Sequence, residues 1–91
     1  MDKKQFLECM KALGDPTRLE IVEMLREGEL CACKIAEHFS MTQPTLSYHM
    51  KQLADAGLVS VRKDWKWSRY SLDFRMIGEL QEYFKDHFSE V

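Results

Sequence analysis

Residues 41–57 read MTQPTLSYHMKQLADAG, a stretch that predicts one capped, amphipathic helix. Thr42 can cap its first turn, and Pro44 stands inside that turn, where the missing N–H of proline leaves no hydrogen bond unmade. Gly57 can end the helix. The apolar residues recur at the spacing of a buried helical face: Leu46, Met50 and Leu53. The other side is polar, so the helix is expected to lie on a core and to present hydrogen-bonding groups outward.

The sequence on either side of this helix predicts a short series of further elements. In chain order we expect helices over residues 3–13, 16–27, 30–39 and 42–56, strands over 58–63 and 67–72, and a last helix that Asp73 caps. Two short helices joined by a tight turn and followed by a hairpin define a winged helix-turn-helix. The fold class is therefore expected to be mainly α with a β-hairpin wing.

The chain as a whole has the composition of one globular domain spanning residues 1–91, with 45% hydrophobic and 31% charged residues. No apolar run approaches the roughly 18 to 20 residues that cross a bilayer. The first residues lack the apolar stretch of a signal peptide. We therefore expect a cytoplasmic protein with no membrane partner, and three cysteines do not suggest a disulfide framework.

Charge is distributed unevenly along the chain, although the net charge is only −2. Residues 41–70 hold five basic and two acidic side chains, or +3, and the rest holds eight basic and thirteen acidic, or −5. A basic segment inside an acidic body is typical of a face that binds nucleic acid. Chance clustering in a short window is the alternative.

The polar side of the 42–56 helix carries groups suited to DNA. Hydroxyl and amide groups can hydrogen-bond base edges or phosphates, and lysine can pair with a phosphate. The helix residues expected to contact double-stranded DNA are Gln43, Thr45, Ser47, Tyr48 and Lys51. An ordinary solvated surface is the alternative, and the adjacent hairpin favours DNA. His49 lies nearer the apolar side, where packing is the favoured interpretation.

The hairpin adds a second basic group. Arg62, Lys63 and Lys66 surround its tip and are expected to reach a groove or the DNA backbone. Trp67 is expected in the core, whereas the role of Trp65 stays open between packing and base stacking.

Cys31 and Cys33 form a Cys-x-Cys pair at the start of the 30–39 helix. Thiolates are soft donors that suit soft ions such as As(III), Sb(III), Cd(II) or Cu(I). Residues i and i+2 point to different sides of a regular helix, so both can hold one ion only if the helix start is distorted or unwound. The alternative is that two small thiols merely pack.

The ordered set of these motifs resembles the ArsR/SmtB family of metal-responsive repressors over most of the chain. The matching stretches are ALGDPTR (12–18), ELCAC (29–33), TQPTLSYHM (42–50), GLV (57–59) and RKDWKWSRY (62–70). The resemblance implies a DNA-binding repressor, not an enzyme, that leaves its operator when a toxic ion binds. It also implies that residues at Gln43, Ser47 and Tyr48 contact the operator.

The resemblance further implies a homodimer that pairs through the first and last helices. The residues suit this, because the last helix carries a wider apolar stripe than one small domain can easily cover. That stripe consists of Ile77, Leu80, Tyr83, Phe84 and Phe88.

By the same resemblance, Cys31 and Cys33 correspond to the thiolate pair of the arsenic-type sensors. As(III) or Sb(III) is then the expected inducer, with Cd(II) or Pb(II) as further candidates. Many such sensors have a third cysteine three residues after the second, where this sequence has Ala36. Cys9 is either the third metal ligand or a core residue, and a small-molecule thiol or hydroxide is the remaining option.

Four other interpretations of the sequence compete with this one. A repressor of the same fold can instead sense oxidants through its thiols. A zinc site on the last helix would use His87 and Glu90, but the upstream partner motif is replaced by DFR (73–75). A cysteine enzyme needs a base in a cleft, which no motif marks. A protein-binding winged domain is disfavoured by the basic segment.

Overall fold

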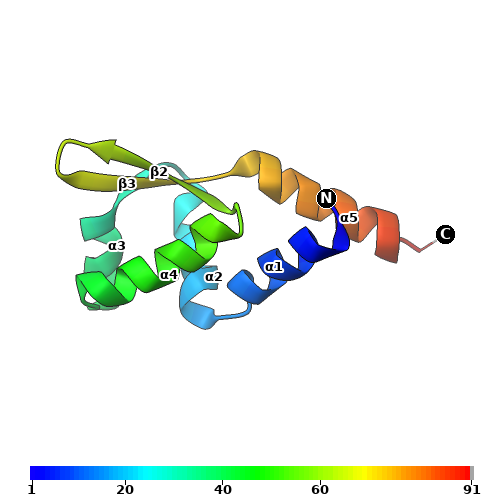
Figure 1. Ribbon diagram of the computed structural model, residues 1–91, viewed down its shortest axis with the longest axis horizontal. Helices are drawn as coiled ribbons and strands as arrows, with labels where there is room; N and C mark the ends of the chain where they lie inside the picture. The colour runs from blue at the N-terminus through cyan, green and yellow to red at the C-terminus, as the bar shows by residue number, and fades with distance from the viewer. Residues whose placement is uncertain (91) are drawn as a thin grey trace.

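Five helices and three strands make up residues 1–90, the part of the chain that the computed structural model describes (Figure 1). In chain order they are α1 (Lys3–Leu13), α2 (Pro16–Leu25), β1 (Leu30–Cys31), α3 (Ala32–Phe39), α4 (Gln43–Asp55), β2 (Val59–Asp64), β3 (Trp67–Leu72) and α5 (Phe74–Phe88). α3 and α4 form the helix-turn-helix, and β2 and β3 form the wing. The predicted fold class, mainly α with a β-hairpin wing, is confirmed.

The helices begin where short polar side chains cap them. Asp15 accepts a hydrogen bond from the backbone N–H of Arg18 at 3.1 Å, and Asp73 accepts one from Met76 at 3.0 Å. Thr42 caps α4 in the same way. Each cap satisfies an N–H that has no partner inside its helix. The caps predicted at Thr42 and Asp73 are therefore confirmed.

The start of α3 differs from the prediction. Leu30 and Cys31 are extended and form β1, which pairs antiparallel with β3 in a sheet of order β1-β3-β2. Leu30 lies opposite Tyr70, and Cys31 lies opposite Arg69. The expectation of a helix from residue 30 was wrong because this pairing joins segments far apart in the sequence. The helix proper begins at Ala32, with Cys31 as its N-cap.

All five helices contribute buried side chains to one hydrophobic cluster below the sheet. Its largest fully buried members are Ile21, Leu25, Ile35, Leu46, Met50, Leu53 and Leu58. Trp67 is not among them: its side chain is 43% exposed, so the prediction of a core role was wrong. β3 places Trp67 at the outer end of the wing, opposite Asp64 and next to the hairpin loop rather than in the core.

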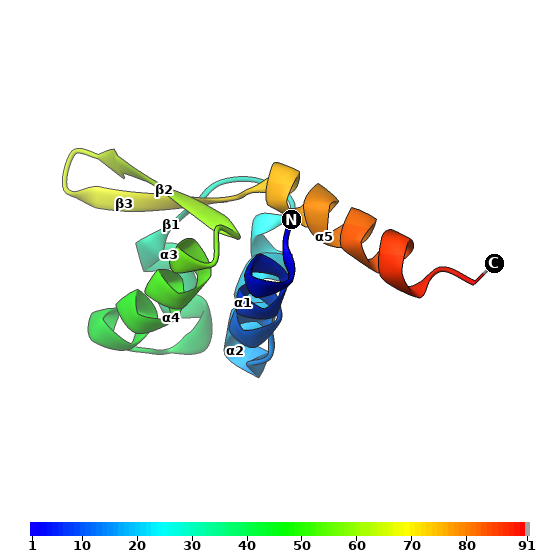
Figure 2. The ribbon, with the colours of Figure 1, turned by 45° about the vertical axis from the view of Figure 1, so that its right-hand side comes forward.

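Helix α5 extends away from the rest of the molecule and lies beside the N-terminal half of α1 (Figure 2). The Phe6 and Tyr83 rings stack with centroids 3.9 Å apart, which joins the two helices. Of the predicted stripe on α5, only Leu80 is buried. Phe84 and Phe88 stay 47% and 70% exposed, so the chain itself leaves much of this stripe uncovered. None of the helices in residues 1–90 is long and apolar enough to cross a membrane.

Candidate DNA-binding face and cysteine pair

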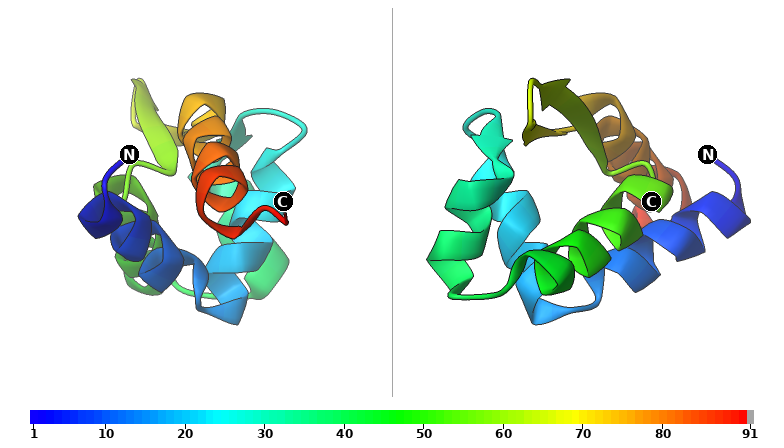
Figure 3. Two further views of the ribbon diagram at one scale, coloured as in Figure 1. Left: turned by 90° about the vertical axis from the view of Figure 1, so that its right-hand side faces the viewer. Right: turned by 60° about the vertical axis from the view of Figure 1, so that its left-hand side comes forward.

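The turn between α3 and α4 fixes the angle of the exposed helix. Ser40 adopts a left-handed conformation with φ 54°, and its N–H donates to the carbonyl of Glu37 at 3.2 Å. The N–H of Met41 donates to the carbonyl of Ala36 at 3.1 Å. These bonds satisfy carbonyls at the end of α3 and reverse the chain. The two helices then diverge on either side of the turn (Figure 3).

Helix α4 presents its polar side to solvent. Leu46, Met50 and Leu53 are buried beneath it. The predicted contact residues of the helix are all exposed: Gln43, Thr45, Ser47, Tyr48 and Lys51. The ammonium of Lys51 lies 2.8 Å from the carboxylate of Asp55, so part of its charge is already neutralised. The free hydrogen-bonding groups of this face are therefore concentrated in the first two turns of α4.

His49 has a different place. It is half-buried, and the guanidinium of Arg18 donates to its Nδ1 at 3.3 Å. The same guanidinium donates through Nε to the carbonyl of Ala12 at 2.7 Å. His49 thus links α4 to the end of α1 through Arg18, in agreement with the packing role expected for it. No spacing pattern in the sequence indicates Arg18 as the partner of His49.

The wing is exposed, but its basic side chains differ in how far they are already paired. Arg62 makes two hydrogen bonds to the carboxylate of Glu29, at 2.7 and 3.2 Å, and this contact lowers the pKa of Glu29. Lys63 donates to the hydroxyl of Ser68 at 2.9 Å. Lys66 has no carboxylate partner among residues 1–90, and its ammonium lies over the rings of Trp65 and Trp67. Lys63 and Lys66 are therefore the wing cations that carry unneutralised charge.

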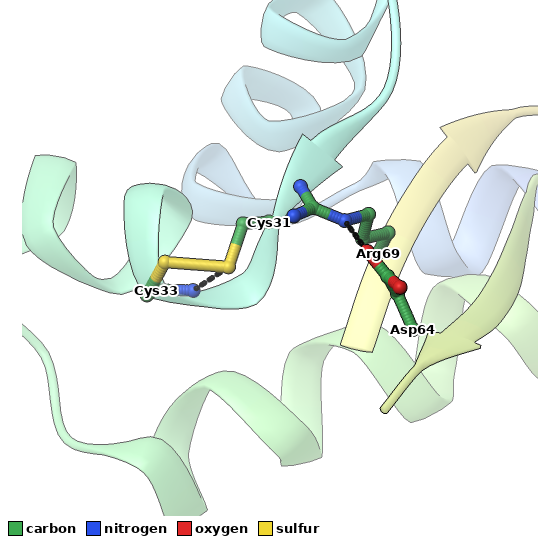
Figure 4. The surroundings of a disulfide bond; sticks show 4 residues. All are labelled: Cys31, Cys33, Asp64 and Arg69. Atoms are coloured by element: carbon green, nitrogen blue, oxygen red, sulfur yellow. Dashed lines mark hydrogen bonds and ion pairs between the residues drawn. A yellow bond between two sulfur atoms is a disulfide. The ribbon is translucent and has the colours of Figure 1, made fainter. Parts of the chain in front are cut away.

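Cys31 and Cys33 lie together where β1 becomes α3, and the structure joins them as a disulfide (Figure 4). Their Cα atoms are 5.2 Å apart, and the N–H of Cys33 donates to the sulfur of Cys31 at 3.3 Å. The expectation of cysteines without a disulfide is therefore wrong for this pair. The irregular helix start that the spacing required is present, because Cys31 is extended and the helix begins at Ala32, so both sulfurs face one point.

A shallow pocket surrounds the cysteine pair. Its lining comes from β1, the start of α3 and the wing: Glu29, Leu30, Cys31, Cys33, Lys34, Trp67 and Arg69. Arg69 pairs with Asp64 at 2.9 Å and stands opposite Cys31 across the sheet. Sequence spacing did not point to Arg69 or Trp67 as neighbours of the cysteines, because strand pairing brings them there.

Cys9 lies apart from this pocket, in the hydrophobic core. It is fully buried, and its thiol donates to the carbonyl of Ala56 at 3.4 Å. Burial raises the pKa of the Cys9 thiol, and the carboxylates of Glu8 and Glu79 raise it further, so the thiol stays protonated. Within residues 1–90, no three or more His, Cys, Asp or Glu side chains are grouped to hold a metal ion. The structure thus favours the core interpretation of Cys9.

An exposed polar helix held by a helix-turn-helix and flanked by a basic wing defines a DNA-binding protein of the winged helix-turn-helix class. The model of the bacterial regulatory protein arsR family matches residues 15–61. The chain belongs to this family, and it is a transcriptional repressor rather than an enzyme.

Two relatives and one solved structure illustrate the similarity. The arsenical resistance operon repressor of Staphylococcus xylosus is 44% identical over 82 residues, which cover 90% of this chain and 79% of the relative. A cadmium resistance transcriptional regulatory protein homolog of Staphylococcus aureus is 39% identical over 85 residues, which cover 92% of this chain and 70% of the relative. The homodimeric winged helix-turn-helix domain of a possible ArsR-family regulator from Mycobacterium bovis superposes with a TM-score of 0.74 at 27% identity. The match covers 94% of this chain and 83% of that domain.

Proposed function

We propose that this repressor leaves its operator when As(III), Sb(III) or a similar soft ion binds the thiolates of Cys31 and Cys33. The observation that supports this most directly is the position of the pair. Both sulfurs meet at the first turn of α3, the helix that supports the DNA-reading helix α4. The arsenical and cadmium resistance regulators among the relatives point to the same class of inducer.

The chemistry of the pair fits a soft ion. Once the disulfide is reduced and the thiols lose their protons, two soft donors face one point. The N-terminus of α3 favours negative charge there, which stabilises thiolates. As(III) prefers three sulfur ligands, and Cys9 is committed to the core. A small-molecule thiol or hydroxide would therefore complete the site, and Cd(II) or Pb(II) are secondary candidates for the same donors.

Release would follow from the connections of this turn. Ile35 and Ala36 pack α3 into the core against α4. Cys31 is paired with the wing through Arg69. A change in the conformation of residues 31–33 therefore strains both DNA-contacting elements. Coupling between two sites of this kind is typically worth about 1–3 kcal/mol, or about 5- to 150-fold in affinity.

The experiment is a titration of the reduced protein bound to a fluorescent duplex that the protein has selected from random-sequence DNA. Arsenite is expected to lower the anisotropy to that of free DNA, with a larger effect than Zn(II). An arsenite titration that leaves the anisotropy unchanged under strict reduction would contradict the proposal.

A thiol switch is the second candidate, because the sulfurs of Cys31 and Cys33 lie close enough to form a disulfide. Two thiols and one peroxide molecule would give one disulfide and two waters, with both electrons passing from sulfur to the peroxide. Peroxide should then release the repressor without any metal, and a dithiol reductant should restore binding. Failure of peroxide to change the anisotropy would exclude this mechanism.

We further propose that the protein acts as a homodimer in the cytoplasm, where operator DNA is accessible. Exposed apolar side chains on α1 and α5 support pairing through these helices: Leu7, Phe84 and Phe88. Dimers of this class bind half-sites about one helical turn apart.

A first prediction concerns sequence reading by α4. Ser47→Ala and Tyr48→Ala each remove a group that can hydrogen-bond a base. We therefore expect the difference in binding free energy between specific and non-specific duplexes to shrink by about 1–3 kcal/mol. Fluorescence anisotropy with selected and scrambled duplexes measures this ratio. An unchanged ratio in both variants would show that the face does not read bases.

A second prediction separates the wing cations from the reading helix. Lys63→Ala should weaken binding to all duplexes and reduce the slope of log affinity against log salt by about 0.9 for each subunit, because each subunit loses one phosphate contact. Lys85→Ala removes the same charge from exposed α5 and serves as the matched control. Equal slopes for the two variants would contradict a phosphate contact at Lys63.

A further inference from the structure

The pocket beside the cysteine pair is larger than the two sulfur atoms require. Its volume is about 340 Å³, within the range of roughly 300–1,000 Å³ that small-molecule sites occupy. Cys31 is buried and Cys33 is half-buried, so Cys33 is the more accessible of the two residues that line it. A small organic molecule can therefore lie directly against the pair.

One wall of the pocket is apolar. It is formed by Leu30, which is half-buried, and by Trp67, whose indole stays exposed beside the wing instead of packing in the core. An indole offers a large, rigid surface to the carbon chain of a ligand. The pocket thus supplies a reason for a large aromatic side chain at this position, where the core does not.

The charged groups around the pocket leave one positive charge in excess. The carboxylate of Glu29 is paired with Arg62 at 2.7 Å, and that of Asp64 is paired with Arg69 at 2.9 Å. Lys34, in the first turn of α3, is exposed and has no carboxylate partner within residues 1–90. The pocket therefore favours a ligand with a negative charge.

Arg69 can assist Lys34 in holding such a ligand. Its pair with Asp64 uses Nε, so the outer nitrogens of the guanidinium are available as donors. Figure 4 shows this guanidinium turned from β3 toward the cysteine pair. Guanidinium and ammonium groups form their strongest hydrogen bonds with carboxylates and phosphates, and a carboxylate is the smaller of the two.

We propose that the pocket binds a small thiol that bears a carboxylate, and that its sulfur joins Cys31 and Cys33 as the third ligand of As(III). The inference rests on the proposed function, because it names the co-ligand of the same site. The carboxylate lies at Lys34 and Arg69, and the carbon chain lies along Trp67. Arsenite, As(OH)₃, and the three thiols give three As–S bonds and three water molecules, so no oxidant is needed.

A matched pair of thiols tests the recognition of the carboxylate. Mercaptopropionate and mercaptopropionamide differ only in that the second carries a neutral amide. Arsenite is titrated into protein kept reduced by a phosphine, with either thiol present, and the ultraviolet absorbance of As–S bonds reports binding. An exposed ion pair is worth up to about 5-fold, so two contacts should lower the arsenite dissociation constant about 5- to 30-fold with mercaptopropionate. Native mass spectrometry should show one arsenic and one thiol per subunit.

Variants of the two cations separate the pocket from the chemistry of the thiols in solution, which is the same for every protein. Lys34→Gln should reduce the preference for mercaptopropionate about 5-fold, and the double variant with Arg69→Gln should remove it. Lys85→Gln removes the same charge from α5 and should keep the preference of the parent.

Two kinds of failure can be told apart. A preference in the double variant equal to that of the parent, or complexes that hold arsenic without the thiol, would overturn the pocket proposal and leave Cys31 and Cys33 as the inducer site. Arsenite that binds Cys31→Ser as tightly as the parent, whichever thiol is present, would overturn the proposed function and this inference with it.

Discussion

Cys31→Ser and Cys33→Ser are each expected to abolish release of the repressor by arsenite and to leave its affinity for the operator unchanged. Serine replaces a soft thiolate by a neutral, hard hydroxyl of similar size, so the ion loses one of its two protein ligands. Cys31 caps α3, and serine is a favoured N-cap, so the helix start should survive. In the parent, the operator affinity without arsenite should exceed that with arsenite by about 5- to 150-fold. In each variant this ratio should be about one.

The measurement is operator anisotropy against arsenite concentration under strict reduction, with Cys9→Ser as the matched control. Its hydroxyl can still donate to the carbonyl of Ala56, so the variant should fold with some loss of stability and respond to arsenite like the parent. Arsenite release that persists in both Cys31→Ser and Cys33→Ser would place the inducer site elsewhere. Lost release in Cys9→Ser would instead restore Cys9 as a ligand.

Local signals in the sequence predicted most of the fold. Asp15, Thr42 and Asp73 are caps that act within one turn, and the apolar spacing of α4 depends only on that helix. The exposed residues of α4 followed directly from this spacing. Features of this kind can be predicted because the groups that interact are neighbours in the chain.

The features that the sequence did not predict depend on distant pairing. β1 exists because Leu30 and Cys31 meet β3, which lies about forty residues further along the chain. The ion pair of Arg62 with Glu29 spans 33 residues and ties the wing to the segment before Cys31. Trp67 was placed in the core because tryptophan is usually well buried, yet strand register carries it to the exposed end of the hairpin. The surroundings of the cysteine pair therefore had to come from the structure.

Phe84→Glu is expected to convert a dimeric repressor into a folded monomer that no longer holds its operator. Phe84 is 47% exposed, and its ring packs edge-on against Phe6 of α1 at 5.4 Å, so it belongs to the apolar surface that we assign to the dimer. A carboxylate there would be buried without a partner on association. Binding to a palindrome would then lose the second half-site, which is worth about 100- to 10,000-fold when two modules are linked.

Sedimentation velocity at micromolar concentration and anisotropy on the selected duplex test this result together. Lys85→Gln lowers the net charge by the same amount on the exposed side of α5 and should remain a dimer. Leu80 is unsuitable for the test because it is buried in the chain's own core, where a charge would unfold the protein. Circular dichroism should show that Phe84→Glu keeps its helices. An interface that buries position 84 could not take up the carboxylate without weaker association of the subunits. A Phe84→Glu protein that sediments as a dimer and binds DNA like the parent would therefore show that the subunits pair through another surface.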